Sequence, residues 1–272
     1  MMDYLQAIVI SFIEGLTEYL PISSTAHMIF ASSYYGIENQ DFVKFFQVSI
    51  QFGAILAVVV LYWKKFFDFT RINFYVKLGI AVIPALILGK IFDDMIDDIL
   101  EKPIPIACAL IIGGIALLFL DEYFKHQTIH REEDITKKNA LVIGFWQCLA
   151  MMPGTSRSAA SIIGGMQQRL DRQTAAEFSF FLAVPTMFAV TCYATFLKTY
   201  EDSHMKGYEL LQQSPDNLRI FLIGNVIAFF VAMIAIKLFI GVVKKYGFKP
   251  WGWYRIVAGI IFLVYFTNHT HS

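Results

Sequence analysis

The chain has 272 residues, of which 57% are hydrophobic and 26 are phenylalanine. A soluble domain of this length carries fewer apolar residues, so the composition indicates one integral membrane domain over residues 1–272. The 22 basic and 22 acidic residues cancel, which argues against a nucleic-acid partner. The three cysteines lie in apolar runs without metal-ligand spacing, so we expect neither a disulfide nor a zinc site.

The first segment of the chain is apolar but contains a polar break. Residues 4–19 and 24–35 are two short apolar runs that flank Pro21 and the hydroxyl residues after it. Neither run comfortably spans a bilayer core of about 30 Å. Irregular backbone survives at membrane depth only where it is buried in protein or lines a polar cavity. We therefore expect a re-entrant helical hairpin whose tip reaches the membrane interior.

Six further apolar runs are long enough to cross a membrane. They cover residues 42–62, 74–91, 104–120, 175–197, 218–243 and 253–266. Between the third and fourth runs, residues 140–165 contain a second polar break, Pro-Gly-Thr-Ser-Arg-Ser at 153–158, and predict a second re-entrant hairpin. The expected fold is an all-α polytopic membrane protein with six transmembrane helices and two re-entrant hairpins.

The two hairpin segments resemble each other. An offset of 132 residues maps Pro21 onto Pro153 and Ser24 onto Ser156, and an offset of 133 maps Glu14 onto Gln147. Each half holds one hairpin and three crossings, and an odd number of crossings gives the halves opposite orientations. We expect an inverted-topology repeat of residues 1–124 and 138–268, with the site where the hairpin tips meet. Chance matching between apolar segments is the alternative.

Basic residues collect on one side of this topology. These are Lys64, Lys65, Arg71, Lys125, Arg131, Lys137, Lys138, Arg169, Arg172, Lys244, Lys245 and Lys249. The other side has fewer, Lys90, Lys102, Lys198 and Lys206, and an acidic loop with Asp93, Asp94, Asp97, Asp98 and Glu101. By the positive-inside rule, both termini and the acidic loop are expected outside the cytoplasm.

Glu14 and Glu18 are four residues apart, so they share one face of a helix. Two carboxylates this close repel each other, so one is protonated or a cation lies beside them. Mg²⁺ or Ca²⁺ suits a carboxylate pair whose coordination shell is completed by substrate oxygens. We therefore predict that Glu14 and Glu18 hold a divalent cation. The alternative is that both carboxylates only line a water-filled vestibule.

Arg157 follows a Pro-Gly break, where a helix begins with free backbone N–H groups. Its guanidinium and the neighbouring hydroxyls all donate hydrogen bonds, which favours a phosphate ligand. Around it, Gly154, Thr155, Ser156 and Ser158 are candidate substrate contacts. One alternative is that Arg157 only pairs with Glu18 and holds the hairpins together.

The first hairpin offers a similar set of polar groups. Ser23, Ser24 and Thr25 are candidate phosphate contacts or, as the alternative, caps of the helix that follows. His27 could act as general acid, general base or hydrogen-bond donor, although a lone histidine among apolar residues is often only packed. Gln51 is a polar group in a spanning helix that either reaches the site or bonds to another helix.

These motifs resemble the undecaprenyl-diphosphate phosphatase family associated with bacitracin resistance. The resemblance rests on Glu14-Gly-Leu-Thr-Glu18, on Pro21-Ile-Ser-Ser-Thr-Ala-His27 and on Pro153-Gly-Thr-Ser-Arg157-Ser158. It implies hydrolysis of a C55 isoprenyl diphosphate lipid to the monophosphate and inorganic phosphate. It also implies a site reached from the outer face of the bacterial cytoplasmic membrane, where the carrier lipid of cell-wall synthesis is recycled.

The combined reading assigns roles to twelve residues. The candidate catalytic residues are Glu14, Glu18, Ser24, His27, Ser156 and Arg157, and the candidate substrate contacts are Ser23, Thr25, Gln51, Gly154, Thr155 and Ser158. The nucleophile stays open among Ser24, Ser156, His27 and an activated water. The alternative function is a transporter or flippase of a phosphorylated isoprenyl lipid, since inverted repeats with broken helices are a transporter architecture. A homodimer is among the assemblies that the sequence allows.

Overall fold

The computed structural model describes residues 2–100 and 102–269, apart from the side chains of Asp94 and His269, and within these ranges it contains helices but no strand. The first half contains α1 (Tyr4–Thr17), α2 (Ser24–Tyr34), α3 (Asp41–Ser49), α4 (Gln51–Leu61), α5 (Trp63–Phe66), α6 (Ile72–Ile91), α7 (Asp93–Leu100) and α8 (Pro103–Tyr123). The second half contains the 3-10 turn η1 (Glu132–Asp134), α9 (Lys137–Gln147), the 3-10 turn η2 (Cys148–Met151), α10 (Arg157–Gln167), α11 (Arg172–Phe196), α12 (Gly207–Gln212), α13 (Pro215–Tyr246) and α14 (Lys249–His269).

Five helical segments in the described ranges are long and apolar enough to cross a membrane. They are Asp41–Leu61, which is α3 with α4, and the helices α6, α8, α11 and α13. The prediction of an all-helical, multi-pass membrane protein is thus confirmed, and five of the six expected crossings coincide with helices that are long and apolar enough to span. The sixth, residues 253–266, lies within α14, which is helical throughout. Polar and aromatic residues in the first turns of α14, Arg255 among them, lower its hydropathy, and its crossing stays a prediction.

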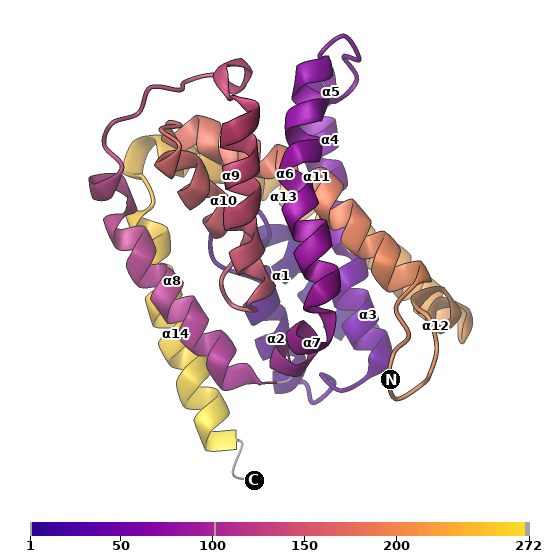
Figure 1. The fold of residues 1–272 in the computed structure, drawn as a ribbon. Helices are drawn as coiled ribbons and strands as arrows, with labels where there is room; N and C mark the ends of the chain where they lie inside the picture. The colour runs from indigo at the N-terminus through magenta and orange to yellow at the C-terminus, as the bar shows by residue number, and fades with distance from the viewer. Residues whose placement is uncertain (1, 101, 270–272) are drawn as a thin grey trace.

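The two interrupted segments form helical hairpins. The helices α1 and α2 pack against each other, and so do α9 and α10. Figure 1 shows α1 and α2 rising from the end of the molecule that carries the N-terminus, while α9 and α10 descend from the opposite end, so that the two turns approach each other in the middle. This arrangement brings chain segments more than 130 residues apart into one site.

The packing of the hairpins is similar in the two halves. The helix α1 packs on α13, and α9 packs on α6. Both contacts are close at a glycine: a Cβ on Gly15 would lie 2.6 Å from the carbonyl oxygen of Ala228, and one on Gly144 would lie 2.3 Å from that of Ala81. Small residues let helix backbones approach in a lipid environment, where apolar burial alone does not drive association.

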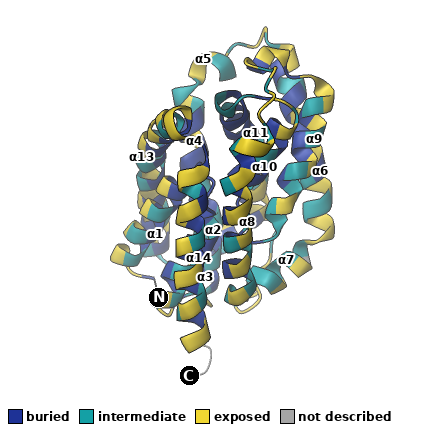
Figure 2. Cartoon of the chain, turned by 90° about the vertical axis from the view of Figure 1, so that its left-hand side faces the viewer, coloured by how far each residue is buried: buried dark blue, intermediate teal, exposed yellow. Residues whose placement is uncertain are grey.

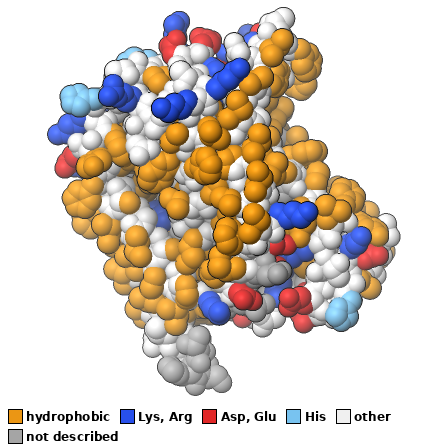
Figure 3. Space-filling view, viewed as in Figure 1, with side chains coloured by type: hydrophobic (Ala, Val, Ile, Leu, Met, Phe, Trp, Pro, Cys, Tyr) orange, Lys and Arg blue, Asp and Glu red, His pale blue; other side chains and the backbone are white. Residues whose placement is uncertain are grey.

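The surface follows the pattern expected of a membrane protein. Buried residues lie mainly on the inner faces of the helices, and exposed residues lie on the outer faces (Figure 2). The exposed residues include large apolar ones such as Leu86, Ile112 and Phe188. In Figure 3 apolar side chains cover the middle of the visible face, and charged side chains gather toward its two ends. The basic segment around α5 lies at one end, and α7, α12 and both termini lie toward the other (Figure 1).

The expected acidic loop and the connection after α11 both contain helices. The acidic segment predicted as a loop forms α7, because its carboxylates and apolar residues alternate with helical spacing, and Glu101 lies outside the described residues. The connection after α11 contains α12, whose first turn Glu209 caps by accepting from the N–H of Lys206 at 2.7 Å. Both departures lie on the side of the molecule that carries the termini.

Candidate active site

Each hairpin turn ends in a serine that starts the next helix. Ser23 precedes α2 with φ of 69°, and Ser156 precedes α10 with φ of 75°. Their side chains accept hydrogen bonds from the backbone N–H groups of Ala26 and Ala159, respectively. Ser156 therefore corresponds to Ser23 at an offset of 133, and the pairing of Ser24 with Ser156 is wrong by one residue. Ser23 therefore caps α2, as the alternative interpretation of this cluster proposed, whereas the Ser24 side chain donates to Glu18.

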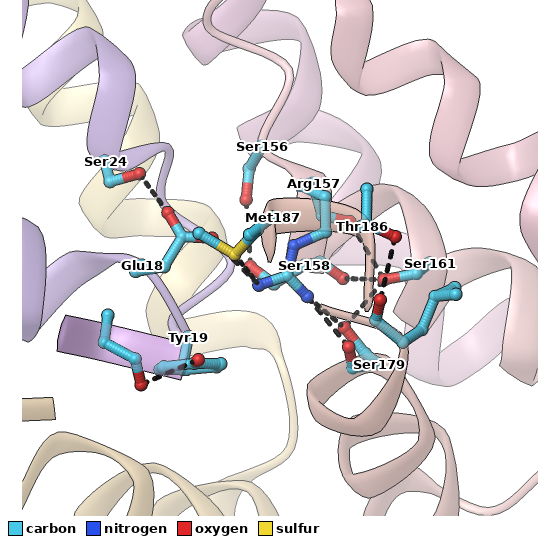
Figure 4. Close-up of polar contacts among 12 residues, drawn as sticks. Glu18, Tyr19, Ser24, Ser156, Arg157, Ser158, Ser161, Ser179, Thr186 and Met187 are labelled. Carbon is cyan, nitrogen blue, oxygen red and sulfur yellow. Dashed lines mark hydrogen bonds and ion pairs between the residues drawn. The ribbon is translucent and has the colours of Figure 1, made fainter. Parts of the chain in front are cut away.

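Glu18 connects the two hairpins. Its Oε2 accepts a hydrogen bond from Ser24 Oγ at 2.5 Å, and its Oε1 accepts one from Nη2 of Arg157 at 2.8 Å (Figure 4). The glutamate is 7% exposed. The hydroxyl, carboxylate and guanidinium thus form a continuous chain of charge-assisted hydrogen bonds in a site shielded from water. The predicted proximity of these three residues is confirmed.

Arg157 is held from several sides. Its Nη1 donates to the carbonyl oxygen of Ser179 at 2.8 Å, and its Cζ lies 5.7 Å from the ring centroid of Tyr19. Nε is buried and makes no hydrogen bond within the described residues. The guanidinium is therefore fixed in position, and its Nε is a buried donor without a partner in the described residues, which suits the recognition of an anion.

The second turn also contacts the first through a serine. Ser158 Oγ donates to the carbonyl oxygen of Leu20 at 2.8 Å and lies 3.1 Å from Ser156 Oγ. Ser158 is fully buried, so this bond fixes the tips of the two hairpins against each other. Ser156 and Ser158 thus lie beside Arg157, as predicted. Nothing in this geometry makes Ser156 a better nucleophile than Ser24.

Glu14 is fully buried one helical turn before Glu18. Neither of its carboxylate oxygens has a hydrogen-bond partner within the described ranges, and Glu18, Ser24 and Arg157 are its polar neighbours. Buried carboxylates are costly unless they are bonded, paired or neutralised. Two oxygen donors without partners fit a hard divalent cation. Within the described residues, no three acidic, histidine or cysteine side chains are placed so that they could hold a metal ion together, so such a cation would need oxygen ligands from the substrate or water.

His27 contacts α14 through Tyr254 and Phe262. Its Nδ1 lies 2.8 Å from the carbonyl oxygen of Ser23, which can only accept, so Nδ1 carries the proton. Nε2 lies 2.8 Å from the hydroxyl of Tyr254, from which the neutral ring accepts. The imidazole makes no direct contact with Glu18 or Arg157 among the described residues. Its role as general acid or base stays a prediction.

An apolar pocket of about 320 Å³ borders His27. It is open to the outside of the helix bundle, and α1, α2 and α14 line it through Ile13, His27, Phe30, Tyr254, Val257, Ala258, Ile261 and Phe262. Thr25 and Gln51 are half-buried and make no side-chain hydrogen bond within the described ranges. Their assignment as substrate contacts stays a prediction.

Gly154 and Thr155 take part in the site through their backbone. Their carbonyl oxygens accept hydrogen bonds at 2.9 Å from Arg255 of α14. The sequence patterns did not point to Arg255, Tyr254 or Ser179. For Arg255, the one available signal was an arginine within an apolar run. Its partners could not be predicted, because any residue provides a backbone carbonyl.

Comparison with known proteins identifies the family. A family described as "Bacitracin resistance protein BacA" matches residues 7–261, nearly the whole chain. The chain belongs to the BacA family. A relative from Flavobacterium johnsoniae named undecaprenyl-diphosphatase is 54% identical over 97% of this chain and 96% of its own. Relatives with the same name from Porphyromonas gingivalis and Bdellovibrio bacteriovorus are 47% and 45% identical, with coverage of at least 96% of each chain.

Membership of the BacA family extends over both hairpins. The matched region begins in α1 before Glu14 and ends in α14 after Arg255, so it includes every residue of the cluster described above. The resemblance read from the two motifs is therefore confirmed at the level of the family.

Proposed function

We propose that this chain hydrolyses undecaprenyl diphosphate to undecaprenyl phosphate and inorganic phosphate, as the names of its relatives indicate for those proteins. The observation that carries the proposal is the chain of hydrogen bonds from Ser24 through Glu18 to Arg157, which joins a hydroxyl, a base and a fixed cation. Phosphoryl transfer depends mainly on positioning and charge stabilisation, and this set supplies both.

Ser24 is the nucleophile that the geometry favours. Glu18 accepts its hydrogen bond at 2.5 Å and can take the proton when the Oγ attacks the terminal phosphorus. The Ser24 Oγ–P bond forms, and the bond between that phosphorus and the bridging oxygen breaks. Undecaprenyl phosphate leaves with the bridging oxygen, and water then hydrolyses the phosphoserine to free inorganic phosphate. Throughout, Arg157 and the N-terminus of α10 stabilise the phosphoryl oxygens.

A divalent cation fits beside the two glutamates. Glu14 and Glu18 would hold Mg²⁺ or Ca²⁺ together with diphosphate oxygens, which accounts for the unpartnered oxygens of Glu14. When bound, the ion neutralises charge on the diphosphate. The residues themselves keep their roles: Glu18 orients Ser24, and Arg157 binds the phosphoryl group.

The isoprenyl chain of the substrate leaves the polar site through the pocket beside His27. The pocket is apolar and opens between α1, α2 and α14, whose outer faces carry exposed apolar residues such as Phe12, Val257 and Ile261. The first isoprene units would pack against Phe30 and Phe262 while the rest of the chain stays in lipid.

The same proposal includes the membrane arrangement. The chain is taken to cross the bacterial cytoplasmic membrane six times, with α14 as the sixth crossing, and to form inverted repeats of residues 1–124 and 138–268 with re-entrant hairpins. The equivalent caps at Ser23 and Ser156 and the matching packing of α1 and α9 support it. The site would open to the extracytoplasmic face, where it recycles the lipid carrier of cell-wall synthesis and confers bacitracin resistance.

The direct test is phosphate release by purified protein in detergent, where transport cannot be mistaken for hydrolysis. Wild type is expected to release phosphate from undecaprenyl diphosphate, and Ser24→Ala is expected to lose at least about 10³-fold in kcat because the nucleophile is absent. Ser32→Ala is the control, since Ser32 is a buried serine of the same helix whose Oγ, among the residues that the structure describes, bonds only to the carbonyl of Ile29. A wild type that releases no phosphate would contradict hydrolysis, and an active Ser24→Ala would exclude Ser24 as nucleophile.

The cation is tested through Glu14. We expect activity to be lost in excess EDTA and restored by Mg²⁺ or Ca²⁺. Glu14→Gln should raise the cation concentration for half-maximal activity at least about tenfold, because it removes one charged ligand. Glu18→Gln should lower kcat further even at saturating cation, because it also removes the partner of Ser24. Full activity of wild type in excess EDTA would remove the cation from the mechanism.

A further inference from the structure

Arg255 of α14 is fully buried, and no carboxylate pairs with it within the described ranges. Its guanidinium donates instead to five backbone carbonyls. Nε bonds to Leu110 at 3.1 Å, Nη1 to Pro21 at 3.0 Å and Thr155 at 2.9 Å, and Nη2 to Ala109 at 3.3 Å and Gly154 at 2.9 Å. One side chain therefore joins the first hairpin turn, the second hairpin turn and α8.

The geometry requires an arginine. Guanidinium carries five donors in a rigid planar fork, whereas a lysine ammonium carries three on a flexible stem. The five carbonyls belong to three segments that are far apart in the sequence, with Pro21 and Arg255 separated by 234 residues. A planar fork bonded to all three segments fixes their relative positions as well as their separation.

Three of the bonded carbonyls belong to the two hairpin turns: Gly154 and Thr155 directly precede Ser156, and Pro21 lies two residues before Ser23. In a planar trans peptide the C=O and the following N–H point in opposite directions. Holding the carbonyl of Thr155 therefore fixes the direction of the N–H of Ser156, at the helix end that would bind phosphate. Holding Pro21 likewise fixes the turn that carries Ser24.

We propose that Arg255 is a positioning residue for phosphoryl transfer, one that aligns the turn that precedes Ser24 with the turn that precedes Arg157. The inference rests on the proposed hydrolysis. Arg255 touches neither Ser24 nor Arg157 directly and acts through the backbone. Because alignment of the nucleophile matters in the transition state more than in substrate binding, its loss should lower kcat and leave KM nearly unchanged.

The test uses one direct and one indirect perturbation of the guanidinium. Arg255→Lys keeps the charge but removes the fork. Gly113→Ala keeps Arg255 and displaces it, since the new Cβ would lie 2.2 Å from Nη2 and 2.7 Å from Cζ. For each variant, kcat and KM for undecaprenyl diphosphate and the unfolding temperature are measured on monodisperse protein, well below that temperature.

Two controls disturb comparable features away from the turns. Gly259→Ala lies in the same α8–α14 contact, where its Cβ would meet Ile111 Cγ1 at 2.5 Å rather than Arg255. Lys77→Met removes another buried cation whose ammonium donates to two backbone carbonyls, those of Glu132 and Glu133 at 2.9 and 3.0 Å. Both controls are expected to lower the unfolding temperature.

Arg255→Lys and Gly113→Ala are expected to lower kcat at least about tenfold with KM within about threefold, whereas both controls keep kcat within about twofold. If kcat is normal in Gly113→Ala and in Arg255→Lys, or falls in step with the unfolding temperature across all four variants, Arg255 is only structural and the inference is overturned. Because the assay depends on an active wild type, an inactive wild type would instead overturn the proposed function.

Discussion

Glu18 is the residue on which the chemistry of the site converges. One of its oxygens accepts from the Ser24 hydroxyl, and the other accepts from Arg157, so a single carboxylate orients the proposed nucleophile and holds the guanidinium in place. Breaking a buried pair leaves an uncompensated charge, which destabilises a protein strongly. Variants of this pair must therefore be compared at equal amounts of folded protein.

We predict that Arg157→Ala lowers turnover on the order of 10²–10³-fold, because the phosphoryl oxygens lose their fixed donor. Arg157→Lys should recover only part of the loss, since an ammonium cannot donate to Ser179 and Glu18 with the same fork. Phosphate release by protein that elutes as a single folded species is the measurement. Arg172→Ala, which removes an ion pair with Asp121 away from the cluster, should keep turnover within about twofold. Normal turnover in Arg157→Ala would contradict the anion site.

The side chains of this cluster could largely be predicted from the sequence. Glu14, Glu18, Ser24 and Arg157 are polar groups in apolar segments, where a charge costs about 2.5–3.5 kcal/mol on insertion scales and needs a functional reason. We expected these residues to lie close together because the two hairpin segments resemble each other and their tips meet. Arg255 could not be found in this way, because its partners are backbone carbonyls and any residue provides a carbonyl.

At the scale of elements, the two turns determine where the polar groups lie. Each turn ends in a serine with positive φ, and the second also contains Gly154 with φ of 92°. The breaks themselves were predicted from Pro21 and Pro153. At this point the predicted register between the repeats was wrong by one residue. Sequence similarity paired Ser24 with Ser156, whereas the backbone conformation pairs Ser23 with Ser156.

Gly154→Ala is expected to distort the second turn. An added Cβ would lie 2.3 Å from the carbonyl oxygen of Ile106, a backbone atom that cannot move aside. Gly36→Ala is the matched control, with φ of 65° but no atom within 4 Å of the new Cβ. Both should lose about 1–2 kcal/mol for the left-handed conformation. Only Gly154→Ala should lose more and also lower turnover, as measured by thermal unfolding and phosphate release. Equal losses in the two variants would show that the close approach is unimportant.

For the molecule as a whole, the basic and the acidic segments lie at opposite ends, which supports the proposed orientation. The basic segments near α5 and before α9 lie at one end, and α7 and both termini lie at the other (Figure 1). The number and position of most spanning helices could be predicted from apolar length alone. The helices α7 and α12 were missed because short amphipathic segments at a membrane surface lack the length signal that identifies a crossing.

We predict that an impermeant thiol reagent labels intact cells at position 98 in α7 and not at position 131, because basic loops stay in the cytoplasm. Single cysteines are introduced after replacement of Cys108, Cys148 and Cys192 by alanine, and permeabilised cells provide the total reactivity. Labelling at 131 alone would reverse the orientation. Equal labelling at both positions in intact cells would contradict an odd number of crossings between them.

The long separation between bonded partners also affects how the protein is made. Glu18 and Arg157 are 139 residues apart, which is about 7–28 s of translation at roughly 5–20 residues per second. Arg255 is made later still, within the last helix. The first hairpin therefore stays in the ribosome-bound chain without its partners until residue 157 is made. A prematurely terminated chain that lacks α14 also lacks the bonds from Arg255 to both turns. Synthesis itself thus delays assembly of the reactive groups until nearly the whole polypeptide exists.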